Sequence, residues 1–242
     1  MNPTTHDPLQ DAHVVVFGGA TGIGLATATA AHARGARVTL VGRTPAKLAI
    51  AAAPLGARTA VADITDRRAV EAVFAKGDPI DHLVITAGTL GGGPLAVSDP
   101  DVLLAALQER IAGSLYAIKA ALPLMPPTGS IVLTGGQLSD RPAAGLSVVA
   151  AAVRGIEALA QALALELKPI RVNVIAPGFV DTPLFDGLGE AARSGLLAQA
   201  AQTLPGGRIG QADEVAQAIL LLLVNSYMNG EVLHVDGGGR LV

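Results

Sequence analysis

The chain has 242 residues, of which 50% are hydrophobic and 15% charged, and its mean hydropathy is +0.49, so intrinsic disorder and fibrous structure are excluded. Its net charge of −3 leaves no cationic surplus for nucleic acid or for an anionic membrane surface. With no cysteine and five scattered histidines, the sequence predicts neither disulfide bonds nor a metal site.

The chain is expected to form a single domain over residues 1–242, because no linker or charge run divides it. Its first residues, MNPTTHDPLQDAH, lack the pattern of a secretory signal, and the long apolar stretch 148–165 is interrupted by Arg154 and Glu157. We therefore expect a cytoplasmic protein without a membrane span. The low charge predicts apolar surface that is buried between subunits, in a homodimer or homotetramer.

Short apolar runs alternate with longer alanine-rich segments of helical character. Strands are expected at 13–17, 37–41, 57–61, 81–85, 129–134, 170–175 and 231–235. Helices between successive strands predict right-handed crossovers, and hence a doubly wound, Rossmann-type α/β fold: a parallel seven-stranded sheet with helices on both faces. Ligands of such sheets bind beyond the carboxyl ends of the strands, where segment 181–204 is expected to form a lid over a small-molecule substrate.

A glycine-rich turn directly follows the first expected strand and opens a helix. Gly18, Gly22 and Gly24 allow a tight turn and a close approach of the backbone to a pyrophosphate. The N-terminus of the helix then supplies N–H groups and a favourable dipole to the anion. The turn therefore predicts a dinucleotide site.

The chain resembles the short-chain dehydrogenase/reductase family over essentially its whole length. The motifs that carry the resemblance are the glycine turn, Asp63, Ala87-Gly88, Pro177-Gly178 with Thr182, and the closing segment 230–238. The resemblance implies an oxidoreductase with a nicotinamide cofactor. It implies cofactor contacts at Gly18, Ala20, Thr21, Gly22, Ile23, Gly24, Arg43, Asp63, Ile64, Ala87, Gly88, Pro177, Gly178, Val180 and Thr182.

The choice between NAD(H) and NADP(H) depends on the residues just after the second strand. An acidic residue there binds the ribose 2′-hydroxyl of NAD, whereas an arginine accepts the 2′-phosphate of NADP. This chain has Gly42-Arg43-Thr44 at that place. The planar guanidinium of Arg43 favours NADP(H) over NAD(H). The alternative is that Arg43 is an ordinary solvated loop residue.

The sequence departs from the family at all four positions to which the resemblance assigns catalysis. The asparagine position falls on Arg110, the serine position on Gly136, the tyrosine position on Val149 and the lysine position on Val153. None of these residues readily exchanges a proton. We interpret the chain as a divergent member without the usual Asn-Ser-Tyr-Lys residues, and its catalytic residues are not identified from sequence.

Three side chains near the vacated positions are weak substitutes. Arg110 and Ser114 share one helix face, and Arg110 can stabilise an oxyanion or hold an acidic substrate if it faces the pocket. The equally weighted alternative is an arginine that faces solvent or another subunit. Gln137 is placed to hydrogen-bond a substrate, although an ordinary loop role is favoured. Asp140 and Arg141 are expected to form an ion pair within a loop.

Three functions follow from these observations. The favoured one is an NADP(H)-dependent oxidoreductase with atypical proton chemistry, acting on substrates such as iminium ions or activated C=C bonds. The second is a catalytically silent NADP(H)-binding sensor or subunit. The third is non-redox use of the same pocket, as in a lyase or isomerase.

Overall fold

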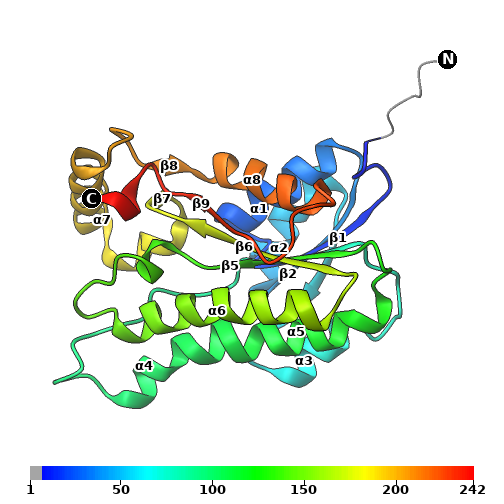
Figure 1. Ribbon diagram of the computed structural model, residues 1–242, viewed down its shortest axis with the longest axis horizontal. Coiled ribbons are helices and arrows are strands. Elements are labelled where there is room, and N and C mark those ends of the chain that lie inside the picture. Colours follow the sequence, from blue (N-terminus) through cyan, green and yellow to red (C-terminus); the bar gives the residue numbers. More distant parts are fainter. Residues whose placement is uncertain (1–6) are drawn as a thin grey trace.

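The computed structural model describes residues 7–242, and its centre is a twisted parallel sheet (Figure 1). The strand order is β3-β2-β1-β4-β5-β6-β9, and every neighbouring pair is parallel. The strands are β1 (His13–Phe17), β2 (Arg37–Gly42), β3 (Arg58–Val61), β4 (His82–Ile85), β5 (Ser130–Thr134), β6 (Arg171–Pro177) and β9 (Val232–Val235). This confirms the doubly wound, Rossmann-type sheet of seven strands, with each expected strand displaced by at most two residues.

Helices cover the sheet on both faces (Figure 1). On one face lie α3 (Arg67–Val73), α4 (Pro100–Leu107), α5 (Gly113–Ala121) and α6 (Ser147–Glu166). The other face carries α1 (Gly22–Ala33), α2 (Pro45–Ala52) and α8 (Ala212–Val224). The central strands β1, β4 and β6 are buried along their whole length, because their side chains pack alternately into the two layers.

Helix α6 is long and apolar enough to match a membrane span. It packs against β5 and β6 and buries Val149, Val153, Ile156 and Ala160, among others. It is therefore a core helix of the domain. Residues 1–6, which begin the N-terminal segment expected to lack a signal, lie outside the described residues.

A π-helical turn, η2 (Gln108–Ala112), separates α4 from α5. The apolar pattern runs through all three segments, so the sequence gives no sign of the break. Such π-bulges often occur at functional sites. This one carries Arg110.

The expected lid follows β6 and contains more regular structure than its composition indicated. A two-residue strand, β7 (Val180–Asp181), pairs with β8 (Gly210–Gln211), and between them lie η5 (Pro183–Leu188) and α7 (Glu190–Thr203). Only Leu197 and Ala200 of α7 are buried. The segment therefore lies at the carboxyl edge of the sheet with few core contacts.

Candidate functional site

The glycine turn after β1 is built so closely that side chains do not fit. Gly18 has a φ of +80°, and a Cβ on it would lie 2.6 Å from the Thr86 Oγ1 atom. A Cβ on Gly24 would lie 2.3 Å from the Gly18 carbonyl oxygen. Helix α1 begins in this turn, and its N-cap Thr21 makes no side-chain hydrogen bond to the helix. The first N–H groups of α1 therefore lack a side-chain cap and suit an anion.

The turn contacts two other segments that the sequence assigned to the cofactor. A Cβ on Gly18 would lie 2.9 Å from the Ala87 nitrogen, and one on Gly22 would lie 3.3 Å from Thr182 Cγ2. The Thr86 hydroxyl donates to the Phe17 carbonyl oxygen at 2.9 Å and so ties β4 to β1. Three segments distant in sequence thus meet at the carboxyl edge of the sheet. The remaining predicted cofactor residues of these segments lie in the same loops and strand ends or in the first turn of α1. They are Ala20, Ile23, Gly88, Pro177, Gly178 and Val180.

Arg43 and Asp63, which follow β2 and β3, form a long ion pair of 3.9 Å between Arg43 Nη1 and Asp63 Oδ2. The other oxygen of Asp63 accepts hydrogen bonds from the Thr65 nitrogen and hydroxyl. Partial burial alone would raise the pKa of Asp63, but these two hydrogen bonds and the Arg43 charge together lower it. The Arg43 side chain is 62% exposed and accessible to a ligand. Ile64, by contrast, packs its side chain into the core, which leaves its backbone for any cofactor contact.

The positions that the resemblance assigns to serine, tyrosine and lysine are close together and apolar. Val149 and Val153 are buried on one face of α6, with exposed fractions of 0% and 2%. Gly136 follows β5, and a Cβ on it would lie 3.8 Å from Val153 Cγ1 and from the Pro177 carbonyl oxygen. A methyl group at Gly136 would therefore meet its neighbours at ordinary contact distances.

Arg110 is buried, which corrects the alternative of a solvent-facing arginine. Its Nη2 donates to the Thr89 carbonyl oxygen at 3.2 Å, and its guanidinium lies against Gly88, whose Cβ would be 2.9 Å from Arg110 Cζ. Glu109 accepts from the Thr89 nitrogen and hydroxyl, both at 2.8 Å. Burial lowers the pKa of Arg110, which the Glu109 charge opposes. Glu109 and Arg110 on the π-helical turn thus both hydrogen-bond to Thr89, in the loop after β4.

The two other weak substitutes occupy different places. Ser114 is buried in the first turn of α5. The Gln137 Oε1 atom is buried without a hydrogen-bond partner and lies against the C-terminal turn, where a Cβ on Gly239 would be 2.6 Å from it. Gln137 therefore faces the chain terminus and the end of the expected lid at Leu204.

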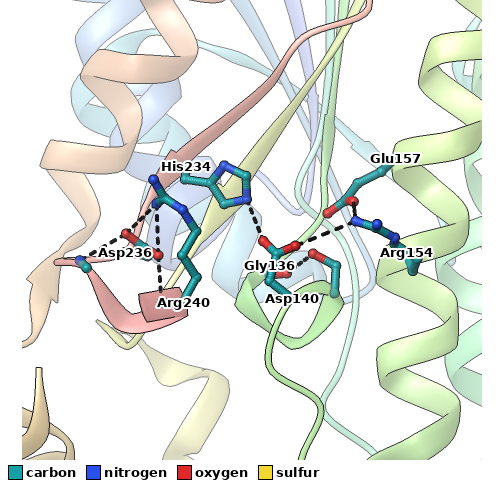
Figure 2. Close-up of polar contacts among 9 residues, drawn as sticks. Gly136, Asp140, Arg154, Glu157, His234, Asp236 and Arg240 are labelled. Carbon is teal, nitrogen blue, oxygen red and sulfur yellow. Dashed lines mark hydrogen bonds and ion pairs between the residues drawn. The ribbon is translucent and has the colours of Figure 1, made fainter. Parts of the chain in front are cut away.

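A charged network beside Gly136 was not anticipated from the sequence (Figure 2). The Asp140 Oδ2 atom lies within hydrogen-bond distance of His234 Nε2, at 2.9 Å. The other carboxylate oxygen, Oδ1, lies 3.6 Å from Arg154 Nη1. The same Arg154 nitrogen donates to Glu157 Oε2 at 2.9 Å. The expected ion pair between Asp140 and Arg141 was wrong, because helix α6 and strand β9 present closer partners. One feature of the sequence could have indicated this network. Glu157 is an acidic residue one helical turn after Val153, in an otherwise apolar helix.

Three comparisons with known proteins agree on one family. Residues 18–239 match the family model described as enoyl-(acyl carrier protein) reductase. A carbonyl reductase family member 4 from Danio rerio is 33% identical, covering 94% of this chain and 98% of its own. A 3-oxoacyl-[acyl-carrier-protein] reductase from Bos taurus is 34% identical, covering 96% and 99%.

Solved structures extend this likeness to the whole fold. A short-chain dehydrogenase/reductase family protein has a TM-score of 0.88 at 31% identity, covering 97% of this chain and 99% of its own. A small-chain dehydrogenase in complex with NADPH has a TM-score of 0.85 at 32% identity, covering 96% and 100%. The MalC reductase/Diels–Alderase of Malbranchea aurantiaca reaches 0.91 at 28% identity, covering 98% and 99%. The chain belongs to the short-chain dehydrogenase/reductase family and has the fold of its nicotinamide-dependent oxidoreductases.

Proposed function

We propose that this protein is an NADP(H)-dependent oxidoreductase that transfers hydride without the tyrosine–lysine pair of its family. The observation that carries the proposal is the contrast at one sheet edge. The glycine turn, in which Gly18 and Gly24 have no room for a Cβ, meets Ala87 and Thr182 at the carboxyl edge of the sheet. The positions that the resemblance assigns to serine, tyrosine and lysine hold glycine and valine instead.

The glycine turn fits a dinucleotide on its own geometry. Gly18 and Gly24 have no room for a side chain, and the uncapped start of α1 offers its N–H groups to a pyrophosphate. Thr182, packed on Gly22, and the Ala87-Gly88 backbone border the place of the nicotinamide half. When bound, the cofactor supplies or accepts a hydride.

Arg43 supports a preference for NADP(H). Its guanidinium is exposed at the end of β2, and its contact with Asp63 is long enough to leave donors free for a 2′-phosphate. A phosphate with two negative charges would also be a stronger partner for Arg43 than the Asp63 carboxylate. One of the similar solved structures, a small-chain dehydrogenase, is a complex with NADPH, so NADP(H) is a cofactor that this fold holds in that relative.

The apolar catalytic positions limit the substrate. A positioned general acid or base contributes about 10²–10⁴-fold to a rate, and neither Val149 nor Val153 can act as one. Substrates that need little proton assistance, namely iminium ions and activated C=C bonds, are therefore favoured over simple ketones. Orientation of the reactants still accelerates such a reaction.

Isothermal titration with NADPH and NADH tests the cofactor proposal. We expect NADPH to bind more tightly, and Arg43→Ala to weaken NADPH about tenfold while NADH changes little, because only NADPH carries the 2′-phosphate. Arg34→Ala is a matched control, since Arg34 pairs with Asp7 away from the turn. Equal losses for both dinucleotides would contradict a role for Arg43 in cofactor choice.

A catalytically silent NADP(H)-binding sensor or subunit is the second candidate. The burial of Val149 and Val153 favours it, because apolar side chains that pack into the core stabilise the fold and cannot transfer a proton. NADPH binding without any NADPH oxidation across carbonyl, iminium and enone panels would favour this candidate over the reductase.

A homodimer or homotetramer is proposed for the assembly. Exposed apolar side chains lie on the helices of one face: Val102 and Leu104 on α4, Leu115 on α5 and Leu165 on α6, each more than 40% exposed. Their burial between copies would remove apolar surface from water. Light scattering coupled to size-exclusion chromatography measures the mass of the particle directly.

A further inference from the structure

Arg110 is a buried cation whose hydrogen-bond donors are largely unused. Its exposed fraction is 8%, the same as that of Arg171, the other buried arginine of residues 7–242. Arg171 donates to three carbonyl oxygens, whereas Arg110 makes a single hydrogen bond, from Nη2 to the Thr89 carbonyl oxygen. The fold thus buries a guanidinium at the carboxyl edge of the sheet without satisfying it.

One nitrogen of this guanidinium is open to a ligand. Nε is fully buried and has no hydrogen-bond partner. Nη1 makes no hydrogen bond within residues 7–242 either, but it is not fully buried. Part of the surface that Arg110 still exposes therefore lies at Nη1, whose N–H groups can donate to a ligand without giving up a partner in the protein.

The guanidinium lies beside the loop that meets the glycine turn. A Cβ on Gly88 would lie 3.0 Å from Arg110 Nη1, and a Cβ on Gly18 would lie 2.9 Å from the nitrogen of Ala87, the residue before Gly88. The Ala87-Gly88 backbone borders the proposed place of the nicotinamide half of the cofactor. The free nitrogen of Arg110 is therefore next to the place where hydride transfer is proposed.

Ser114 adds a second donor on the same side of the helix. It follows Arg110 by four residues, and residues at this spacing share a helix face. Only 2% of Ser114 is exposed, its hydroxyl makes no hydrogen bond within the described part of the chain, and that oxygen is not fully buried. Two donors on successive turns, one of them charged, thus reach a surface without a partner.

The acid beside Arg110 is engaged elsewhere. Glu109 Oε2 accepts from the nitrogen and the hydroxyl of Thr89, both at 2.8 Å, so this carboxylate holds the loop after β4. Arginine stays protonated in proteins, and a buried charge without a counter-ion is costly. A ligand that brings a negative charge to Nη1 is therefore favoured over a neutral one.

We propose that Arg110, assisted by Ser114, binds a carboxylate of the substrate, so that the substrate class is an unsaturated acid anion. This rests on the proposed reductase function and narrows its substrates to those in which the C=C or C=N⁺ group stands close to a carboxylate. A substrate that carried only a positive charge would be repelled by Arg110. The guanidinium binds and orients the acid group and transfers no proton.

The test is titration calorimetry of protein loaded with NADP⁺, with cyclopentanecarboxylate as the anionic probe and cyclopentanecarboxamide as the neutral probe of the same shape. We expect wild type to bind the carboxylate more tightly than the carboxamide. Arg110→Met, which keeps an unbranched side chain and removes the charge, should weaken the carboxylate at least about tenfold and leave the carboxamide nearly unchanged. Arg68→Met removes the same charge from an exposed position on α3 and is the matched control, which should change neither.

Ser114→Ala is the second variant, because the Ser114 hydroxyl holds no other part of the described chain and its loss should not unfold the protein. It should weaken the carboxylate about threefold. If Arg110→Met fails to fold, unchanged carboxylate binding in Ser114→Ala would overturn the assignment.

Three further outcomes are decisive. Equal binding of the two probes by wild type would overturn the assignment. So would an Arg110→Met protein with a lower urea midpoint and an unchanged preference for the carboxylate, since Arg110 would then serve only to hold Thr89. Failure of wild type to bind NADP⁺ would instead overturn the proposed function, and the same two probes titrated into the free protein would still test Arg110.

Discussion

The two edges of the sheet treat buried polar atoms in opposite ways. At the amino edge, Arg171 donates to the carbonyl oxygens of Leu222 and Leu223 at 2.8 and 2.6 Å and so closes the C-terminal end of α8. His82 on β4 contacts the hydroxyl of Ser130, on the strand β5 that separates β4 from β6, at 2.8 Å. In residues 7–242, each of the four buried side-chain atoms without a hydrogen bond lies in a segment toward the carboxyl edge: Arg110 Nε, Gln137 Oε1, Glu157 Oε1 and Arg193 Nε, the last of which is 3.4 Å from Asp186 Oδ1.

This difference separates the part of the molecule built for stability from the part built for ligands. A satisfied buried network stabilises the fold, whereas an unsatisfied buried group costs free energy unless a ligand completes it. Natural proteins retain such costs mainly at functional sites. Substitutions at one edge at a time test this difference.

The largest effect is expected from Gly24→Ala at the carboxyl edge. Its Cβ would lie 2.3 Å from the Gly18 carbonyl oxygen, which is backbone and cannot rotate away. The turn must therefore open, and we expect NADPH affinity to fall about 1000-fold, or roughly 4 kcal/mol. Titration calorimetry measures it.

Gly195→Ala in α7 is the control for this change, because a Cβ there meets nothing within 4 Å. It should leave NADPH binding intact and slightly stabilise the helix. NADPH affinity in Gly24→Ala close to that of wild type would show that the turn does not form the dinucleotide site.

At the amino edge we expect Arg171→Met to destabilise the fold by about 4 kcal/mol, because it leaves several carbonyl oxygens at the end of α8 without their charged donor. The affinity of the remaining folded protein for NADPH should not change. Urea denaturation and calorimetry measure the two quantities separately. A loss of affinity without a loss of stability would mean that the two edges are not independent.

The sequence predicted the strands of the sheet well and the carboxyl edge only in part. The strands were predicted to within two residues because buried parallel strands are continuous apolar runs between glycine and polar breaks. The glycine turn was predicted because its spacing is local. By contrast, β7 and β8 contain two residues each and pair across a long connection, so no periodicity marks them.

The charged network was missed for a related reason. Asp140 and His234 are 94 residues apart, and only the pairing of β9 with β6 brings them together. Arg154 and Glu157 were interpreted only as interruptions of an apolar helix. The π-helical turn that buries Arg110 likewise leaves no trace in the apolar pattern. Contacts set by tertiary packing are not readable from local spacing.

The pH dependence of stability tests the amino edge more gently. Burial lowers the pKa of His82 to about 4, so its folded-state pKa is below the unfolded value near 6.5. Below pH 6.5 His82 binds a proton in the unfolded chain but stays neutral in the folded chain. The free energy of unfolding therefore falls by about 3 kcal/mol as the pH drops from 6.5 to 4. His82→Asn should remove this part of the pH dependence in urea titrations at several pH values. Parallel curves for wild type and variant would contradict it.

The smallest effect is expected where the carboxyl edge leaves room. Gly136 has an extended backbone with a φ of 165°, and a Cβ on it would meet its neighbours only at 3.8 Å. Gly136→Ser should therefore change the free energy of unfolding by less than about 1 kcal/mol. A Cβ on the adjacent Gly135 would lie 3.0 Å from Val174 Cγ1, so Gly135→Ser should cost about 2 kcal/mol through overpacking. Urea midpoints of the two variants give the comparison, and a larger loss for Gly136→Ser than for Gly135→Ser would mean that Gly136 is the more tightly packed of the two.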